Sequence, residues 1–128
     1  MIAYREDHDV DLDALGVLRA ACVFAAKDRA YLAQQVAGAR WVAHAYDGVR
    51  LVGFARAISD GVSSAYVSSV MVDPAYRRRG IGRALIERIV GGRDDTKFVL
   101  HTRKEAAAFY AAVGFAHASD MMVRDRRR

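Results

Sequence analysis

The chain has 128 residues, 53% of them hydrophobic, which is enough apolar material for one core, so we expect a single domain over residues 1–128. A single cysteine excludes a disulfide framework within the chain. The formal net charge of +5 indicates an anionic partner but does not say whether that partner is a nucleic acid, a membrane surface or a small phosphorylated molecule.

The sequence shows neither a signal-peptide run nor an apolar stretch long enough to span a membrane. The first eleven residues are acidic and carry no apolar run of signal-peptide length, and Arg19 and Lys27 interrupt the long apolar stretch before it could span a bilayer. We therefore expect a cytoplasmic protein that does not act at a membrane. Cys22 lies in an apolar run, which favours a small buried side chain over a nucleophile.

The first half of the chain predicts two helices followed by three strands. Helical spacing of Leu12, Leu15, Leu18 and Cys22 predicts a first helix over residues 11–26, with Asp9 or Asp11 as its N-cap. A weaker pattern predicts a second helix over residues 28–36. Two β-like runs on either side of Asp47-Gly48 predict a hairpin, and a third strand over residues 65–72 is stopped by Pro74.

The second half predicts a helix, a strand and another helix. The period becomes helical at Ile81 and Gly91-Gly92 ends it, "KFVLHT" at 97–102 predicts a buried strand, and "EAAAFYAAV" at 105–113 predicts a short helix. Gly114 is placed to take the left-handed position after that helix. One or two short strands are expected within residues 116–125. This order predicts an α+β fold, a mixed sheet with about four helices on its faces.

The stretch "DPAYRRRGIGRAL" at residues 73–85 gathers positive charge around a predicted helix N-terminus. The charges are Arg77, Arg78, Arg79 and Arg83, and the stretch also contains Gly80 and Gly82. Unpaired N–H groups and the positive end of the helix dipole bind phosphate oxygens, and glycines let those oxygens come close. The stretch therefore predicts a pyrophosphate site.

Two better-known phosphate motifs do not fit this stretch. The dinucleotide fingerprint needs a third glycine where Leu85 stands, and the P-loop needs a Gly-Lys-Ser/Thr sequence that the chain lacks. The glycine pair alone also fits a tight turn with a solvated arginine surface.

A second motif, "FYAAVGF" at residues 109–115, adds specificity. R-x-x-G-x-G at 77–82 together with F-Y-x-x-x-G-F at 109–115 resembles the GNAT superfamily of N-acetyltransferases. The stretches "VGFARAISD" and "DPAYRRRGIGRALIE" are also similar to the plastid and bacterial members called serotonin N-acetyltransferase-like. The resemblance implies the GNAT fold, a mixed central sheet with a splayed strand pair, and the cosubstrate acetyl-CoA.

The resemblance also implies where the coenzyme binds. The pyrophosphate would be bound by the backbone amides of Arg78, Arg79, Gly80, Ile81, Gly82 and Arg83. Arg77 would be the first motif residue, with a side chain that serves the loop as much as the ligand. The backbone of Val70, Met71 and Val72 would pair with the pantetheine arm, while the strand "KFVLH" would splay away from it.

For catalysis, the resemblance implies that the Val70 N–H donates to the thioester oxygen and that Tyr110 protonates the departing thiolate. Phe109 would belong to the core or form a wall for the coenzyme. The attacking amine must lose a proton, and the acceptor stays open among Ser69, His101 through water, and Asp60. Tyr66 stands where some relatives carry glutamate, and an asparagine common before the tyrosine helix is missing, with Arg103 and Lys104 nearby.

These features predict transfer of an acetyl group from acetyl-CoA to a primary amine by direct attack in a ternary complex. The alternative is a coenzyme-binding module without turnover; a nucleic-acid binder is disfavoured because no recognition motif accompanies the charge. We expect the partner to be an amine acceptor, either a small molecule or a protein, and the chain to be a monomer or homodimer. Phe24, Tyr31 and Trp41 could line the acceptor site. The four histidines and Cys22 show no metal-ligand spacing, so we expect no metal.

Overall fold

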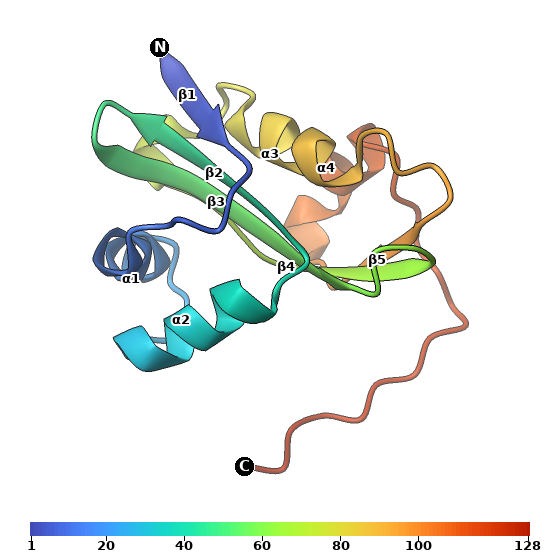
Figure 1. The fold of residues 1–128 in the computed structure, drawn as a ribbon. Helices are drawn as coiled ribbons and strands as arrows, with labels where there is room; N and C mark the ends of the chain where they lie inside the picture. Colours follow the sequence, from blue (N-terminus) through green and yellow to red (C-terminus); the bar gives the residue numbers. More distant parts are fainter.

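A five-stranded mixed sheet organises the computed structural model, which describes all 128 residues (Figure 1). The strands lie side by side in chain order, and the first four are antiparallel while the last two are parallel. They are β1 (Ile2–Arg5), β2 (Trp41–Asp47), β3 (Arg50–Ser59), β4 (Ser64–Val72) and β5 (Lys97–Leu100). The sheet confirms the predicted hairpin and the mixed architecture.

Four helices cover the sheet, two on each face (Figure 1). They are α1 (Leu12–Ala21), α2 (Arg29–Gly38), α3 (Ile81–Val90) and α4 (Ala107–Ala112), with 3-10 turns at Pro74–Tyr76 and Lys104–Ala106. None of these helices has the length and apolar character needed to cross a membrane.

Strand β3 is buried on both faces and separates two cores. Phe54 packs into the cluster formed with α1 and α2, whereas Ala55 belongs to the cluster formed with α3. A Cβ at Gly53 would lie 2.8 Å from Leu85 Cδ1, so α3 packs directly on the backbone of β3. Burial on both faces explains why most of this strand is a continuous apolar run rather than an alternating one.

Helix α1 ends at Ala21, five residues before the predicted limit. Asp11 caps its start, as expected, by accepting hydrogen bonds from the Asp13 and Ala14 N–H groups. At the other end Val23 takes a left-handed conformation with φ of 61°, and the Phe24 N–H donates to the Arg19 carbonyl at 2.9 Å. This is a Schellman arrangement with valine where glycine is usual, so the turn is strained.

Two parts of the fold differ from the sequence-based expectations. Strand β1 was not predicted; it pairs antiparallel with β2, and its residues alternate between half-buried and exposed. The strands predicted within residues 116–125 are wrong, because residues 116–128 form no helix or strand and extend away from the sheet (Figure 1). The apolar run there is only Met121 to Val123, flanked by Asp120 and the terminal arginines, and such a short run cannot bury enough surface to offset the cost of ordering.

Candidate active site

Buried Asp73 fixes the entry to the glycine-arginine stretch. One carboxylate oxygen accepts a hydrogen bond from the Ala75 N–H at 2.9 Å, and the other accepts from Arg50 Nη2 at 2.7 Å. The guanidinium groups of Arg50 and Arg79 lie over the Tyr76 ring at 5.2 and 5.0 Å, and the Tyr76 hydroxyl donates to Asp47. The chain is therefore positioned before the glycines begin.

The backbone amides that follow are open. Arg78 and Gly80 both have positive φ, 65° and 78°, and Gly80 is the N-cap of α3 without a side-chain cap. No N–H group of residues 78–83 donates a hydrogen bond within the protein. A Cβ at Gly80 would meet no atom within 4 Å. Unpaired amides at an uncapped helix start are the arrangement that binds anions in proteins, and the pyrophosphate site stays a prediction.

The arginine side chains around these amides have partners of their own. Arg77 Nε donates to the Val72 carbonyl at 3.2 Å, so this side chain braces the loop against the end of β4. Arg83 Nε donates to Glu87 at 2.8 Å. The same Val72 carbonyl accepts from Cys22 Sγ at 3.3 Å, and burial raises the pKa of that thiol, which agrees with a buried structural cysteine.

Gly82 lies in a tightly packed position, which the sequence did not reveal. A Cβ on Gly82 would lie 3.1 Å from Phe109 Cζ and 3.5 Å from Val72 Cγ2. The start of α3 therefore contacts both the end of β4 and the helix that carries Tyr110. The two glycines have different roles, one open to a ligand and one joining three elements.

A bulge in β4 frees part of that strand. The register runs from Phe54↔Met71 to Arg56↔Ser68, so Ser69 and Val70 together lie opposite the single residue between them on β3. Ser69 has a φ of 55°. A bulge leaves one extra residue outside the ladder, so the pairing of β4 with β3 is irregular at Ser69 and Val70.

The parallel pairing of β4 with β5 ends well before β4 does. It covers Ser64–Val67 on β4, whereas β4 continues to Val72. Met71 has a buried side chain in the α1 core, so only its backbone is available. The last residues of β4 consequently offer a free strand edge, as the splayed pair of the resemblance implied.

Tyr110 lies on α4 and packs against the same core cluster as Val70 and Val72 of β4. Its ring makes edge contacts with Phe109 and Phe115, at centroid distances of 5.0 and 5.9 Å. Its hydroxyl makes no hydrogen bond, and burial raises the pKa of the phenol. Gly114, with a φ of 100°, closes the helix as predicted, and Val70 packs against the same core cluster as Tyr110.

The candidate proton acceptors have distinct surroundings. Ser69 Oγ accepts a hydrogen bond from Arg56 Nε at 3.1 Å, and exposed His101 lies edge-on to the Tyr66 ring at 5.8 Å. Asp60 accepts from the N–H groups of the turn between β3 and β4, at 2.9 and 2.8 Å, and from a serine hydroxyl. These hydrogen bonds, that of the serine hydroxyl most of all, hold the pKa of Asp60 far below its usual range, which makes it a poor base.

Two corrections concern the acceptor side. Trp41 packs against Phe98 at 5.9 Å and under the Arg93 guanidinium at 4.2 Å, on the α3 face, so it does not lie with Tyr31 of α2. Sequence reasoning also missed Arg56, a buried cation on β3. Its signal was visible, since it is the one charge inside the run "LVGFARAIS".

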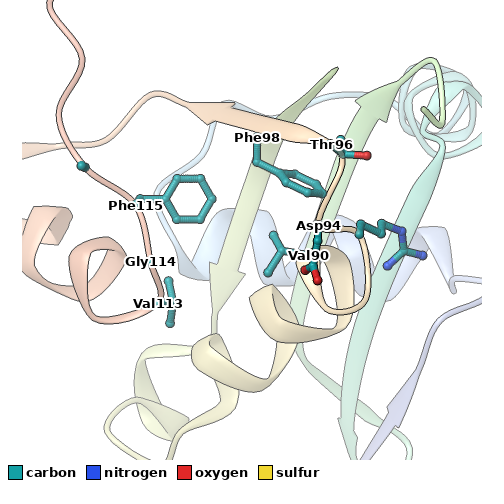
Figure 2. A pocket seen from close by; sticks show the side chains of 9 residues that line it. Val90, Asp94, Thr96, Phe98, Val113, Gly114 and Phe115 are labelled. Carbon is teal, nitrogen blue, oxygen red and sulfur yellow. The ribbon is translucent and has the colours of Figure 1, made fainter. Parts of the chain in front are cut away.

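A cavity of about 370 Å³ lies elsewhere, at the C-terminal end of α3 (Figure 2). Val90, Phe98 and Phe115 line it together with Asp94. A helix of ten residues is about 15 Å long, so this cavity is separated from the loop at the start of α3 by the length of the helix. Phe115, which lines this cavity, also contacts the Tyr110 ring at a centroid distance of 5.9 Å. The structure gathers no cluster of three or more histidine, cysteine or acidic side chains suited to a metal.

Residues 38–117 match the family model described as acetyltransferase (GNAT) domain, and the chain belongs to this family. It is 31% identical to a chloroplastic GCN5-related N-acetyltransferase of Arabidopsis thaliana, over 91% of this chain and 61% of that protein. It is 39% identical to serotonin N-acetyltransferase 2, chloroplastic, of Oryza sativa subsp. japonica, over 56% of this chain and 37% of that protein. The chain thus spans less than two thirds of these curated relatives.

Among solved structures, a GNAT-family acetyltransferase from Streptococcus pneumoniae TIGR4 superposes with a TM-score of 0.83 and 26% identity over the full length of both chains. This similarity confirms the fold class that the paired motifs implied.

Proposed function

We propose that the chain transfers the acetyl group of acetyl-CoA to a primary amine by direct attack within a ternary complex. Membership of the GNAT family, which uses acetyl-CoA, supports the cosubstrate. The observation that carries the proposal is the row of unpaired amides at residues 78–83, which follows the end of β4 that β5 leaves unpaired. A cytoplasmic location, the monomer or homodimer, and the exclusion of nucleic acid stay predictions.

Binding uses the backbone. The backbone N–H groups of Arg78, Arg79, Gly80, Ile81, Gly82 and Arg83 donate hydrogen bonds to the pyrophosphate oxygens. The Arg77 side chain holds the loop by donating to the Val72 carbonyl, so it serves the loop as well as the ligand. The free edge formed by Val70, Met71 and Val72 pairs with the pantetheine arm in the manner of an added strand.

In the chemical step a C–N bond forms and the C–S bond of the thioester breaks. The Val70 N–H donates to the thioester oxygen as negative charge grows there, which is worth about 3 kcal/mol. Tyr110 gives its proton to the departing thiolate, and its raised pKa keeps that proton in place until then. The free hydroxyl of Tyr110 also favours an enzyme over the alternative, a coenzyme-binding module without turnover.

The amine must attack in its neutral form, although free alkylamines have a pKa near about 10.4. We propose that its proton leaves through Ser69 to water. Arg56 donates to the Ser69 oxygen and lowers its basicity, so the hydroxyl relays the proton rather than keeping it.

Thermal unfolding with coenzyme A, acetyl-CoA and dephospho-coenzyme A tests binding, and thiol release with a panel of amines tests turnover. A ligand at about one hundred times its Kd adds about 2.7 kcal/mol to the free energy of unfolding. Stabilisation together with thiol release supports the enzyme. Stabilisation without release for any amine favours the silent module, and no response to any of the three ligands overturns both.

A further inference from the structure

Arg56 is a buried cation beside the proposed reaction centre. It is 8% exposed, and strand alternation places it on the α1 and α2 face, the same face as Phe54. Its Nε donates to Ser69 Oγ at 3.1 Å and its Nη2 to Ser68 Oγ at 3.4 Å. None of the ion pairs of the structure includes it.

A second buried cation lies near it. Arg19 on α1 is 6% exposed, donates to the Ala25 carbonyl at 2.9 and 3.2 Å, and likewise forms no ion pair. Burial and the charge of Arg19 lower the pKa of Arg56, and the groups that oppose this are the phenols of Tyr66 and Tyr31. No carboxylate of the protein neutralises the pair.

Such an arrangement is costly unless something else supplies the negative charge. A guanidinium does not release its proton in proteins, and an uncompensated buried ion is strongly destabilising. Every fully buried polar side-chain atom of the structure has a hydrogen-bond partner. The Nη1 atoms of Arg56 and Arg19 donate no hydrogen bond, so both reach solvent and both are free to bind an anion.

We propose that the acceptor is a small amine that also carries an oxyanion group, a carboxylate or a phosphate, and that Arg56 binds this group with support from Arg19. The inference rests on the proposed acetyl transfer. Ser69, which Arg56 holds, directly precedes Val70, so an anion on this guanidinium lies within a small molecule's length of the thioester. A planar guanidinium matches either oxyanion through two parallel hydrogen bonds.

Pairs of amines that differ only in the oxyanion group test the assignment. Phenylalanine with phenethylamine and 5-hydroxytryptophan with serotonin vary a carboxylate, and phosphoethanolamine with ethanolamine varies a phosphate. We expect kcat/KM from thiol release to favour the charged member of at least one pair by about tenfold or more, the range of a charge-assisted hydrogen bond. The preferred pair then identifies the oxyanion.

Arg56→Met removes the charge and keeps an apolar side chain of similar length. It should bring the preference ratio close to one, and Arg19→Met should reduce it in part. Arg88→Met is the matched control, because Arg88 is on α3, on the other face of the sheet, where its guanidinium lies 4.3 Å from the centre of the Tyr4 ring. This variant should leave the ratio unchanged. The ratio, rather than the rate, is the readout because Arg56 also holds Ser69.

Equal or better turnover of the neutral members overturns the inference. An equal loss of kcat/KM for both members of a pair in Arg56→Met also overturns it, because Arg56 would then serve only to hold the bulge. If coenzyme A binds but no amine is acetylated, thermal shifts of the coenzyme complex decide. Stabilisation by phenylalanine or phosphoethanolamine that Arg56→Met abolishes supports the site, and its absence overturns it. Failure of the proposed function is distinct, since it shows as no response to coenzyme A or acetyl-CoA.

Discussion

Two glycines at opposite ends of α3 provide a matched test of the coenzyme loop. Gly80, with φ of 78°, starts the helix, and Gly92, with φ of 73°, follows its end. At both positions a Cβ would meet no atom within 4 Å. Alanine at either position therefore adds the same left-handed strain and no clash. The cost is about 1 kcal/mol, which lowers Tm by roughly 3–5 °C for a domain of this size.

Only Gly80→Ala should weaken coenzyme binding, because Gly80 lies among the unpaired amides of residues 78–83, where an added methyl group hinders the close approach of phosphate oxygens. Hydrogen bonds to a charged group are worth about 1.5–3 kcal/mol each, so losing one weakens affinity by about 10- to 150-fold. Thermal unfolding of both variants across a coenzyme A titration measures strain and affinity together. If Gly80→Ala binds coenzyme A as tightly as Gly92→Ala does, the amides of this loop are not the pyrophosphate site.

Three further variants test catalysis, pH response and strain. Tyr110→Phe should lower kcat for thiol release by about 10²- to 10⁴-fold and change the free energy of unfolding by less than about 0.5 kcal/mol, since the hydroxyl makes no hydrogen bond; full activity would remove Tyr110 as the proton donor. His44 is fully buried and burial lowers its pKa, so the unfolded chain binds the proton more readily. Urea unfolding should therefore show that this contribution to stability is complete above about pH 6.5 and falls as the pH drops below it. His44→Gln should reduce this dependence on pH. A wild type that gains stability toward about pH 5 would contradict the prediction. Val23→Gly should raise Tm by roughly 3–5 °C, because Val23 has φ of 61° and its side chain is 83% exposed, and a lower Tm would show that the turn is not strained.

The loop was predictable because its information is local. Charge, glycines and a following helical period are all contained in residues 73–85, and the structure places open amides there. The role of Gly82 was not predictable, since it depends on Phe109 lying 3.1 Å from an added Cβ, a contact between distant parts of the chain. Strand β1 escaped notice because four residues alternate too briefly to be told from an acidic terminus.

Arg56 shows the same limit at the candidate site. The sequence displays a charge within an apolar strand, but a single charge among apolar residues is ordinarily paired with a partner from another element. Its functional meaning depends on the absence of a carboxylate nearby and on the approach of Arg19 from α1, which only the tertiary structure supplies. The failed strand within residues 116–125 is the reverse case, in which a local apolar pattern has no surface to pack on.

The contacts of Tyr76 tie the β2–β3 hairpin to the ligand loop. Its hydroxyl donates to Asp47, the last residue of β2, and Arg50, the first residue of β3, binds Asp73. The turn between β2 and β3 is thus coupled through these contacts to the loop proposed to bind the coenzyme. Insertions are commonly tolerated at exposed turns of this kind, but changes in this turn should alter the affinity for the cosubstrate. A random library selected for that affinity should therefore contain substitutions in the turn.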